Sequence, residues 1–326
     1  MPLRGAVYGC GMISEFHLRG WMRIPEVQIV ALCNRTIQRA QERRAQFAPD
    51  ARVYSELPAM VASERLDFID IITTPELHFE HCRAAMAAGL HVICQKPLCD
   101  NLEAARKLVS MANGYSKVFA VHENHRYRPW FQRVCATIPD PAFLRVEHLN
   151  ATEPGEAYKN AASSGVWLEY GSHLVDMMRA MLGEPLRVHA RMHRTNSNVA
   201  GESLAHATFE YKDRTAVIQA GWKHAAVTQS SVLVSSELAE AWYEGTLTRG
   251  ERARLRISHG ANLVSDEQLS PHDEYVESFY LLERECTDAM LGRGRLVQTG
   301  AEHWKTLACT FAAYDSARTG AVVEIR

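Results

Sequence analysis

Strand-like and helix-like hydrophobic patterns alternate along the first third of the chain. Residues 27–33 form a nearly continuous apolar run, and residues 68–72 and 91–94 have the same character, which is typical of buried strands. The stretch 76–88 is amphipathic and stops before Gly89, so it predicts a helix. Such alternation predicts an α/β fold, a doubly wound parallel sheet with helices on both faces. Further elements predicted here are strands at 6–8 and 118–121 and helices at 12–23 and 102–113.

The pattern changes near residue 123. Residues 128–138 predict a linking helix, and after it segments such as 186–194 alternate between apolar and polar positions, as half-buried strands do. One face of such an antiparallel sheet must be covered by the first domain, by helices or by another subunit. We therefore predict two domains, 1–122 and 123–326. Further predicted elements are strands at 204–211, 215–222, 231–235 and 253–258, a hairpin turn at 211–215, and helices at 275–291 and 301–318.

Composition narrows the classes of function. The chain has 326 residues, enough for two cores, and its formal net charge of −2 gives no basis for binding nucleic acid or an anionic membrane. No apolar run reaches membrane-spanning length, and no signal-like segment opens the chain. The eight cysteines contain no Cys-x-x-Cys pair, and the fifteen histidines show no metal-ligand spacing. We expect a cytoplasmic protein with no membrane or nucleic-acid partner and no metal.

A glycine turn near the start carries the first functional signal. Gly9 and Gly11 follow a short apolar run and precede a predicted helix, so free backbone N–H groups and the positive helix end can face a phosphate. The first glycine permits the tight turn, and the second lets a pyrophosphate approach. Ser14 stands at the third glycine position and is small enough for close packing. We predict dinucleotide binding here, with Met12 and Ile13 beside the phosphates.

Other strand ends extend this candidate site, because ligands bind such sheets beyond the carboxyl ends of the strands. Asn34 and Arg35 follow the second strand, where an acidic residue would favour NAD, so their presence favours NADP. Arg35 is otherwise a solvated loop arginine. Lys96 follows a buried strand and precedes Pro97, so it lies at the mouth of the cofactor site or merely caps a turn. The other predicted cofactor contacts are Thr73, Thr74, Pro75, His78, Gln95 and Asn124.

A second constellation lies in the later half. On a helix, Glu169, His173 and Asp176 fall at i, i+4 and i+7 and share one face. A carboxylate one turn from an imidazole can orient the ring and raise its pKa, which suits a general base. The alternative is a solvated face with a structural ion pair.

Together these motifs resemble the Gfo/Idh/MocA family, which includes glucose-fructose oxidoreductase and inositol dehydrogenase. The resemblance spans almost the whole chain. It is carried by the glycine turn, the stretch Thr74-Pro75-Glu-Leu-His78, the stretch Gln95-Lys96-Pro97, the group of Glu169, His173 and Asp176, and the stretch Tyr314 to Gly320 at the end of the last predicted helix. It implies a Rossmann domain followed by an α/β domain with an open, mostly antiparallel sheet. It also implies a homodimer or homotetramer, with that sheet at the subunit interface.

The resemblance assigns roles as well as a fold. It implies an NAD(P)-dependent dehydrogenase that oxidises a hydroxyl of a sugar, sugar derivative or polyol, or reduces the matching ketone. His173 would accept the hydroxyl proton, Lys96 would hydrogen-bond the reacting oxygen, and Glu169 would hold substrate and tune His173. Arg126 and Trp167 would also contact substrate. Tyr158 and Tyr170 join Trp167 as candidates for setting specificity.

Two departures from the family pattern stand out: Gln95 replaces the usual glutamate, and Glu169 replaces the usual aspartate. The run 121–130 resembles a subgroup that includes pentose dehydrogenases. Two other functions occur on this scaffold: a redox-assisted glycosidase or dehydratase that does not consume its cofactor, and a non-catalytic dinucleotide sensor. The presence of Lys96, Glu169 and His173 argues against the sensor.

Overall fold

The chain folds into two compact units, seen here in a computed structural model that describes residues 1–154, 165–196, 198–248 and 250–325. The first unit comprises Met1–Asn124 and Val276–Trp304, and the second comprises His125–Tyr275 and Lys305–Arg326. The segment 276–304 therefore returns to the first unit, whereas the sequence placed it in the second domain. Tyr158 lies outside the described residues. No helix in the described ranges is long and apolar enough to cross a membrane.

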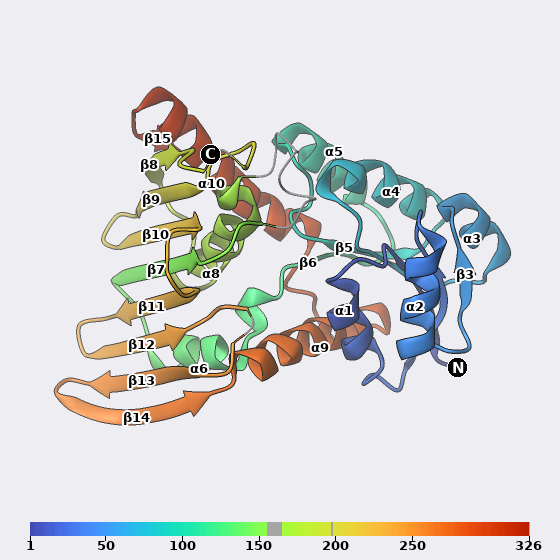
Figure 1. The fold of residues 1–326 in the computed structure, drawn as a ribbon, viewed down its shortest axis with the longest axis horizontal. Coiled ribbons are helices and arrows are strands. Elements are labelled where there is room, and N and C mark those ends of the chain that lie inside the picture. Colours follow the sequence, from blue (N-terminus) through green and yellow to red (C-terminus); the bar gives the residue numbers. More distant parts are fainter. Residues whose placement is uncertain (155–164, 197, 249, 326) are drawn as a thin grey trace. The chain divides into compact units, whose positions relative to one another are not determined.

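The first unit is built on a parallel sheet, as predicted. Its six strands lie in the order β3-β2-β1-β4-β5-β6, with helices on both faces (Figure 1). The chain fills one side of β1 first and then the other, so the connections that follow β1 and β4 lead to opposite sides of the sheet and leave room for a ligand beyond these strand ends. The strands are β1 (Leu3–Tyr8), β2 (Val27–Cys33), β3 (Arg52–Tyr54), β4 (Phe68–Ile71), β5 (His91–Gln95) and β6 (Phe119–His122).

Local sequence sets the ends of the helices in this unit. Helix α4 begins at Pro75, directly after the extended Thr74, and it is followed by Gly89 at φ +75°. Helix α5 is capped by Asn101, whose side-chain oxygen accepts from the Ala104 N–H at 2.9 Å. The helices are α1 (Ser14–Trp21), α2 (Ile37–Phe47), α3 (Leu57–Ser63), α4 (Pro75–Ala87) and α5 (Leu102–Ala112).

The second unit contains a nine-stranded sheet in the order β14-β13-β12-β11-β7-β10-β9-β8-β15. Only β7 and β10 pair in parallel, so the sheet is mostly antiparallel, as the resemblance implied. The predicted hairpin joins β9 and β10, with Glu210 paired to Thr215. The strands are β7 (Phe143–Asn150), β8 (Arg187–His193), β9 (Leu204–Glu210), β10 (Thr215–Trp222), β11 (Gln229–Ser235), β12 (Ala239–Gly245), β13 (Ala253–His259), β14 (Asn262–Leu269) and β15 (Val323–Glu324).

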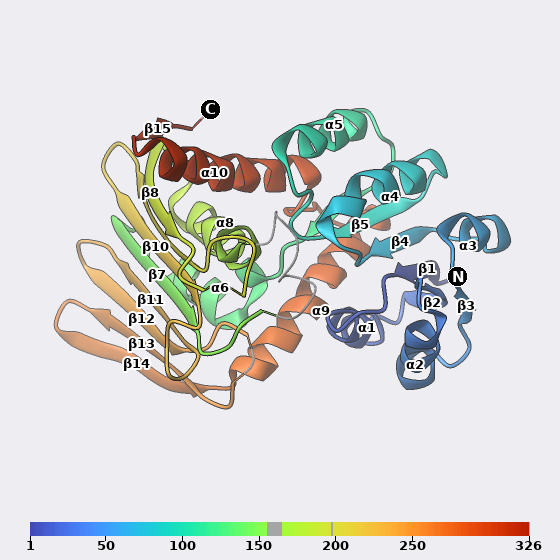
Figure 2. The ribbon, with the colours of Figure 1, turned by 45° about the horizontal axis from the view of Figure 1, so that its top comes forward.

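Helices cover one face of this sheet. Figure 2 shows α6 (Pro129–Thr137), α8 (Ser172–Leu182) and α10 (Gly300–Thr319) along the same side. The core between them and the sheet takes the inward residues of each strand, such as Val188 and Ala190 of β8. Helix α9 (Pro271–Met290) leads from the second unit into the first.

Candidate cofactor-binding and catalytic sites

The glycine turn after β1 is tightly built around Gly9. This residue has φ +109°, its N–H donates to the Cys33 carbonyl at 2.9 Å, and a Cβ there would lie 2.3 Å from the Ile72 carbonyl oxygen. At Gly11, by contrast, a Cβ would meet no atom within 4 Å. The Ser14 hydroxyl donates to the Gly11 carbonyl at 2.6 Å and fixes the turn against α1. Gly9 therefore shapes the chain, and Gly11 leaves open space where a phosphate can approach.

The end of β2 is tied to the same turn. The Asn34 side-chain oxygen accepts from the Cys10 N–H at 2.9 Å, and its amide nitrogen donates to the Thr36 carbonyl at 2.8 Å. Arg35 is exposed, and Met12 is 67% exposed beside Ile13 at the start of α1. The amide thus supports the glycine turn where a ribose-binding carboxylate would otherwise stand.

His78 explains the spacing of the Thr-Pro-x-x-His stretch. From the first turn of α4 its ring reaches back between two backbone oxygens, with Nε2 3.0 Å from the Thr73 carbonyl and Nδ1 3.0 Å from the Pro97 carbonyl. It therefore joins the segments that follow β4 and β5. Burial lowers the pKa of this imidazole. Of the other predicted contacts here, Thr74 is exposed and the Thr73 hydroxyl lies 3.0 Å from His81 Nδ1.

Lys96 follows β5 with its backbone held in place. Its N–H donates to the Gln95 side-chain oxygen at 2.7 Å, and its side chain is half-buried. Asn124, after β6, donates to the Ser278 hydroxyl at 2.7 Å. The strand ends that carry the predicted cofactor contacts all belong to one parallel sheet, so these residues gather along its carboxyl edge.

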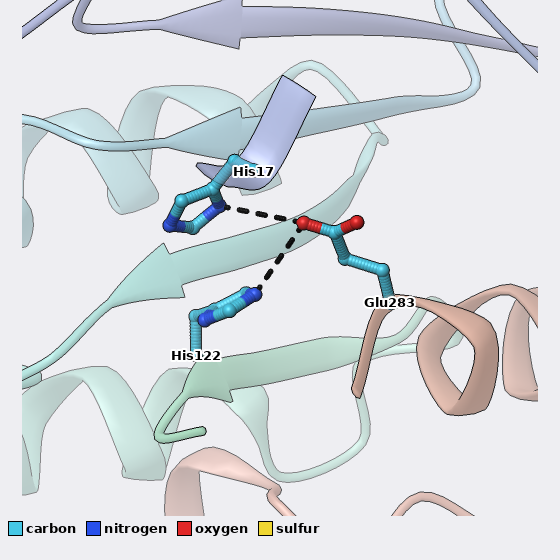
Figure 3. A group of neighbouring side chains, drawn as sticks. All are labelled: His17, His122 and Glu283. Atoms are coloured by element: carbon cyan, nitrogen blue, oxygen red, sulfur yellow. Dashed lines mark ion pairs between the residues drawn. The ribbon is translucent and has the colours of Figure 1, made fainter. Parts of the chain in front are cut away.

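Three buried side chains of the first unit have the donor types of a metal site. They are His17 on α1, His122 on β6 and Glu283 on α9 (Figure 3). Glu283 Oε1 lies 3.8 Å from His17 Nδ1 and 3.5 Å from His122 Nε2. No pattern in the sequence indicates this group, because its members are far apart in the chain and only the fold brings them together.

The catalytic candidates of the second unit lie on an irregular helix. Trp167–Gly171 forms a π-helical turn that continues directly into α8. The wider turn changes the angle between Glu169 and His173 from the regular helical spacing assumed above. His173 is buried, and its ring packs on His125 with centroids 3.8 Å apart, while Glu169 is partly exposed.

Asp176 is engaged in an ion pair. The Arg126 guanidinium binds its carboxylate in bidentate fashion, with Nε 2.7 Å from Oδ2, and the Thr306 hydroxyl donates to Oδ1 at 3.0 Å. Asp176 therefore makes a structural ion pair, but on a buried face and not on the solvated face of that alternative. A role for Arg126 in binding substrate stays a prediction.

Trp167 belongs to the core of the second unit. It is completely buried, its indole N–H donates to the Thr310 carbonyl at 3.0 Å, and its ring stacks on Phe209. Its assignment as a substrate contact stays a prediction, and the proposal below does not depend on it. Tyr170 packs on His148, with ring centroids 4.4 Å apart.

Comparison with known proteins identifies relatives along the whole chain. Residues 3–123 match the model described as "Oxidoreductase family, NAD-binding Rossmann fold", and residues 138–238 match the "GFO/IDH/MocA C-terminal domain". A D-apiose dehydrogenase of Paraburkholderia graminis is 30% identical over 99% of this chain and 90% of its own. A second D-apiose dehydrogenase, from Rhizobium rhizogenes, is 26% identical over 99% of this chain and 97% of its own.

A solved structure has the same fold. An oxidoreductase from Agrobacterium radiobacter, in complex with NAD⁺, L-tartaric acid and magnesium, superposes with a TM-score of 0.87 and is 25% identical. The match covers 100% of this chain and 99% of that one.

Proposed function

Because the chain belongs to the Gfo/Idh/MocA family of oxidoreductases, we propose that its two sites serve the oxidation of a sugar or polyol hydroxyl by NAD(P). The protein is a dehydrogenase that acts on CH–OH groups. One observation supports the assignment of the first site: Gly11 and Lys96 follow strands of the same parallel sheet at its carboxyl edge. The structure leaves open space at Gly11, and the hydrogen bond to the Gln95 side chain holds the backbone of Lys96. Five-carbon sugars are the first substrates to test, since both full-length relatives named above are D-apiose dehydrogenases.

Each proposed catalytic residue has a separate task. His173 accepts the proton of the substrate hydroxyl, and its buried packing against the His125 ring holds the imidazole in one orientation. Lys96 donates a hydrogen bond to the same oxygen and stabilises the negative charge that develops on it. Glu169 binds a neighbouring hydroxyl of the sugar. The bound dinucleotide supplies the acceptor for the hydride that leaves the carbon.

The cofactor we propose is NADP in preference to NAD. Asn34 places no negative charge at the end of β2, and the exposed Arg35 next to it can pair with a 2′-phosphate. Both dinucleotides fit a Rossmann glycine turn, so the preference rests on these two side chains alone.

We also propose a homodimer or homotetramer in a reducing, cytoplasmic setting. One row of residues crosses the face of the nine-stranded sheet opposite the core and contains Val217, Leu233 and Trp242, with Arg145 between Val217 and Leu233. The three apolar side chains are partly exposed. Seven of the eight cysteines are buried, and none forms a disulfide. Light scattering on the purified protein tests the oligomer, since a monomer would contradict it.

The function is tested by following reduced nicotinamide with NADP and NAD over a panel of pentoses, hexoses, polyols and uronates. With an active substrate in hand, Lys96→Met and His173→Asn should each lower kcat by about a hundredfold to ten-thousandfold, while dinucleotide binding persists. Lys107→Ala, which removes only a surface ion pair with Glu103, is the control and should be unchanged. Normal turnover in Lys96→Met would show that Lys96 takes no part in the reaction.

A further inference from the structure

A chain of three hydrogen bonds runs from the backbone of Lys96 into the interior of the first unit. The Lys96 N–H donates to Gln95 Oε1 at 2.7 Å, and Gln95 Nε2 lies 2.8 Å from His17 Nε2. His17 Nδ1 in turn lies 2.8 Å from Asp70 Oδ2. The chain thereby joins the end of β5 to α1 and β4, and both His17 and Asp70 are completely buried.

One donor fixes the direction of every proton in this chain. A backbone N–H can only donate, so the Gln95 oxygen faces Lys96 and the Gln95 NH₂ group faces His17. The NH₂ group can also only donate, so His17 Nε2 accepts with its lone pair and carries no proton. A singly protonated imidazole then has its proton on Nδ1, which donates it to Asp70.

Asp70, at the end of this series of hydrogen bonds, accepts from two donors. The same carboxylate oxygen that faces His17 also accepts from the Trp21 indole N–H, at 2.7 Å. Two donors on one buried carboxylate oxygen are charge-assisted hydrogen bonds, which are stronger than neutral ones. Because Trp21 and His17 both belong to α1, the carboxylate holds that helix at two points one turn apart.

The tautomer also decides how to interpret the group in Figure 3. His17 Nδ1 faces Glu283 but carries a proton directed at Asp70, so it has no lone pair for a metal ion. Burial, together with the charge of Asp70, raises the pKa of Glu283 well above its ordinary value, and burial lowers the pKa of His122. We therefore interpret the group as part of the packing of the first unit and not as a metal site.

We infer that His17 and Asp70 are positioning residues, which hold the Gln95 carboxamide and thereby fix the peptide from which the Lys96 side chain extends. The inference rests on the proposed role of Lys96. A catalytic group must be held within fractions of an ångström, and buried hydrogen bonds behind it provide that precision.

The Gln95 carboxamide determines which nitrogen of His17 carries the proton. A glutamate at the same place would accept from the Lys96 N–H and would need a second donor from His17 Nε2. Because His17 already donates from Nδ1 to Asp70, an ionised glutamate would require a proton on both nitrogens of His17. Gln95→Glu should therefore change the protonation of a histidine in another element without displacing any atom of the chain.

The first arm of the test is spectroscopic. In ¹⁵N-histidine-labelled protein the His17 signal, identified by its loss in His17→Gln, should show a protonated Nδ1 and an unprotonated Nε2. In Gln95→Glu both nitrogens should be protonated. A wild-type His17 with its proton on Nε2, or with a metal on either nitrogen, would overturn the inference. This arm needs no substrate, so it stands even if the proposed function fails.

The second arm asks whether the chain serves the reaction. Gln95→Ala and His17→Ala should each lower kcat about tenfold to a hundredfold, with KM changed far less. The double variant should be no slower than the slower single variant, because either change already breaks the chain. Multiplying effects, or unchanged kcat in both, would overturn the positioning role. Asp70→Asn keeps the shape and serves if an alanine variant fails to fold.

Discussion

In the turn after β1, the two glycines are needed for different physical reasons. Gly9 combines a positive φ with a backbone oxygen 2.3 Å from where a Cβ would stand, so no side chain fits there. Gly11 has neither constraint, and only an incoming ligand would meet its side chain. The geometry at Gly9 fits the tight turn predicted for the first glycine, and the open space at Gly11 fits the phosphate approach predicted for the second.

Substituting the two glycines should therefore have different effects, on stability at Gly9 and on dinucleotide binding at Gly11. Gly9→Ala should lower the free energy of unfolding by about 2 kcal/mol or more. Gly11→Ala should leave stability nearly unchanged and weaken dinucleotide binding at least about tenfold. Gly89→Ala, with φ +75° but open space, isolates the backbone strain and should cost about 1 kcal/mol. Urea titration and calorimetric binding measure the two effects. Normal dinucleotide affinity in Gly11→Ala would place the pyrophosphate elsewhere.

The preference for NADP over NAD also depends on single residues. Asn34→Asp keeps an oxygen for the Cys10 N–H but adds a negative charge at the end of β2. It should lower kcat/KM with NADP about tenfold or more relative to NAD. Arg35→Ala should weaken NADP alone. The ratio of the two kcat/KM values is the measurement, and an unchanged ratio in both variants would contradict the assignment.

At the scale of elements, predictability followed burial only in part, because β7, a central and largely buried strand, was not predicted. The strands β2 and β10 match their predicted limits, because β2 is a nearly continuous apolar run and β10 alternates clearly. β14 was not predicted: it is an edge strand with no buried residue, so its sequence has no hydrophobic pattern. β12 was missed because its inward positions include the small Ala239 and Ala241. The π-helical turn has no known signature in the sequence, and it alters the predicted face of Glu169 and His173.

That turn depends on Gly171, which allows the Trp167 ring to lie against the helix. A Cβ at Gly171 would stand 2.6 Å from Trp167 Cε3. Gly171→Ala should therefore destabilise the protein by about 1–3 kcal/mol and lower activity through the displaced Glu169. Gly294→Ala, whose Cβ would meet only Asp288 at 3.5 Å, is the matched control. Equal urea midpoints for the two variants would show that the π-helical turn tolerates a side chain.

At the scale of the whole molecule, buried histidines make stability depend on pH. Burial lowers the pKa of His78, His91, His122 and His148, the last to about 3. In the folded protein these groups therefore take up protons at a lower pH than in the unfolded chain, where histidines titrate near pH 6.5. The unfolded state then binds more protons, so stability falls as the pH falls below that value.

His148 allows this effect to be measured. It lies 2.6 Å from the Ser230 hydroxyl and 3.1 Å from the Asn150 amide, which leaves no place for a second proton. Between pH 7 and pH 5 its share of the lost stability should be about 2 kcal/mol. The gap in unfolding free energy between wild type and His148→Gln should narrow by that amount as the pH falls. Parallel pH profiles would show that His148 is not responsible.

The return of residues 276–304 to the first unit has a consequence for synthesis. Phe279 packs its ring 5.2 Å from that of His17, and Gln298 accepts from the Val121 N–H at 2.9 Å, so the sheet made first is completed by residues made near the end. A nascent chain that has only its first 124 residues outside the ribosome still lacks these partners, and its apolar surface is open to chaperones or to aggregation. The first unit is thus completed only after residues 276–304, which follow most of the second unit in the chain, have been made.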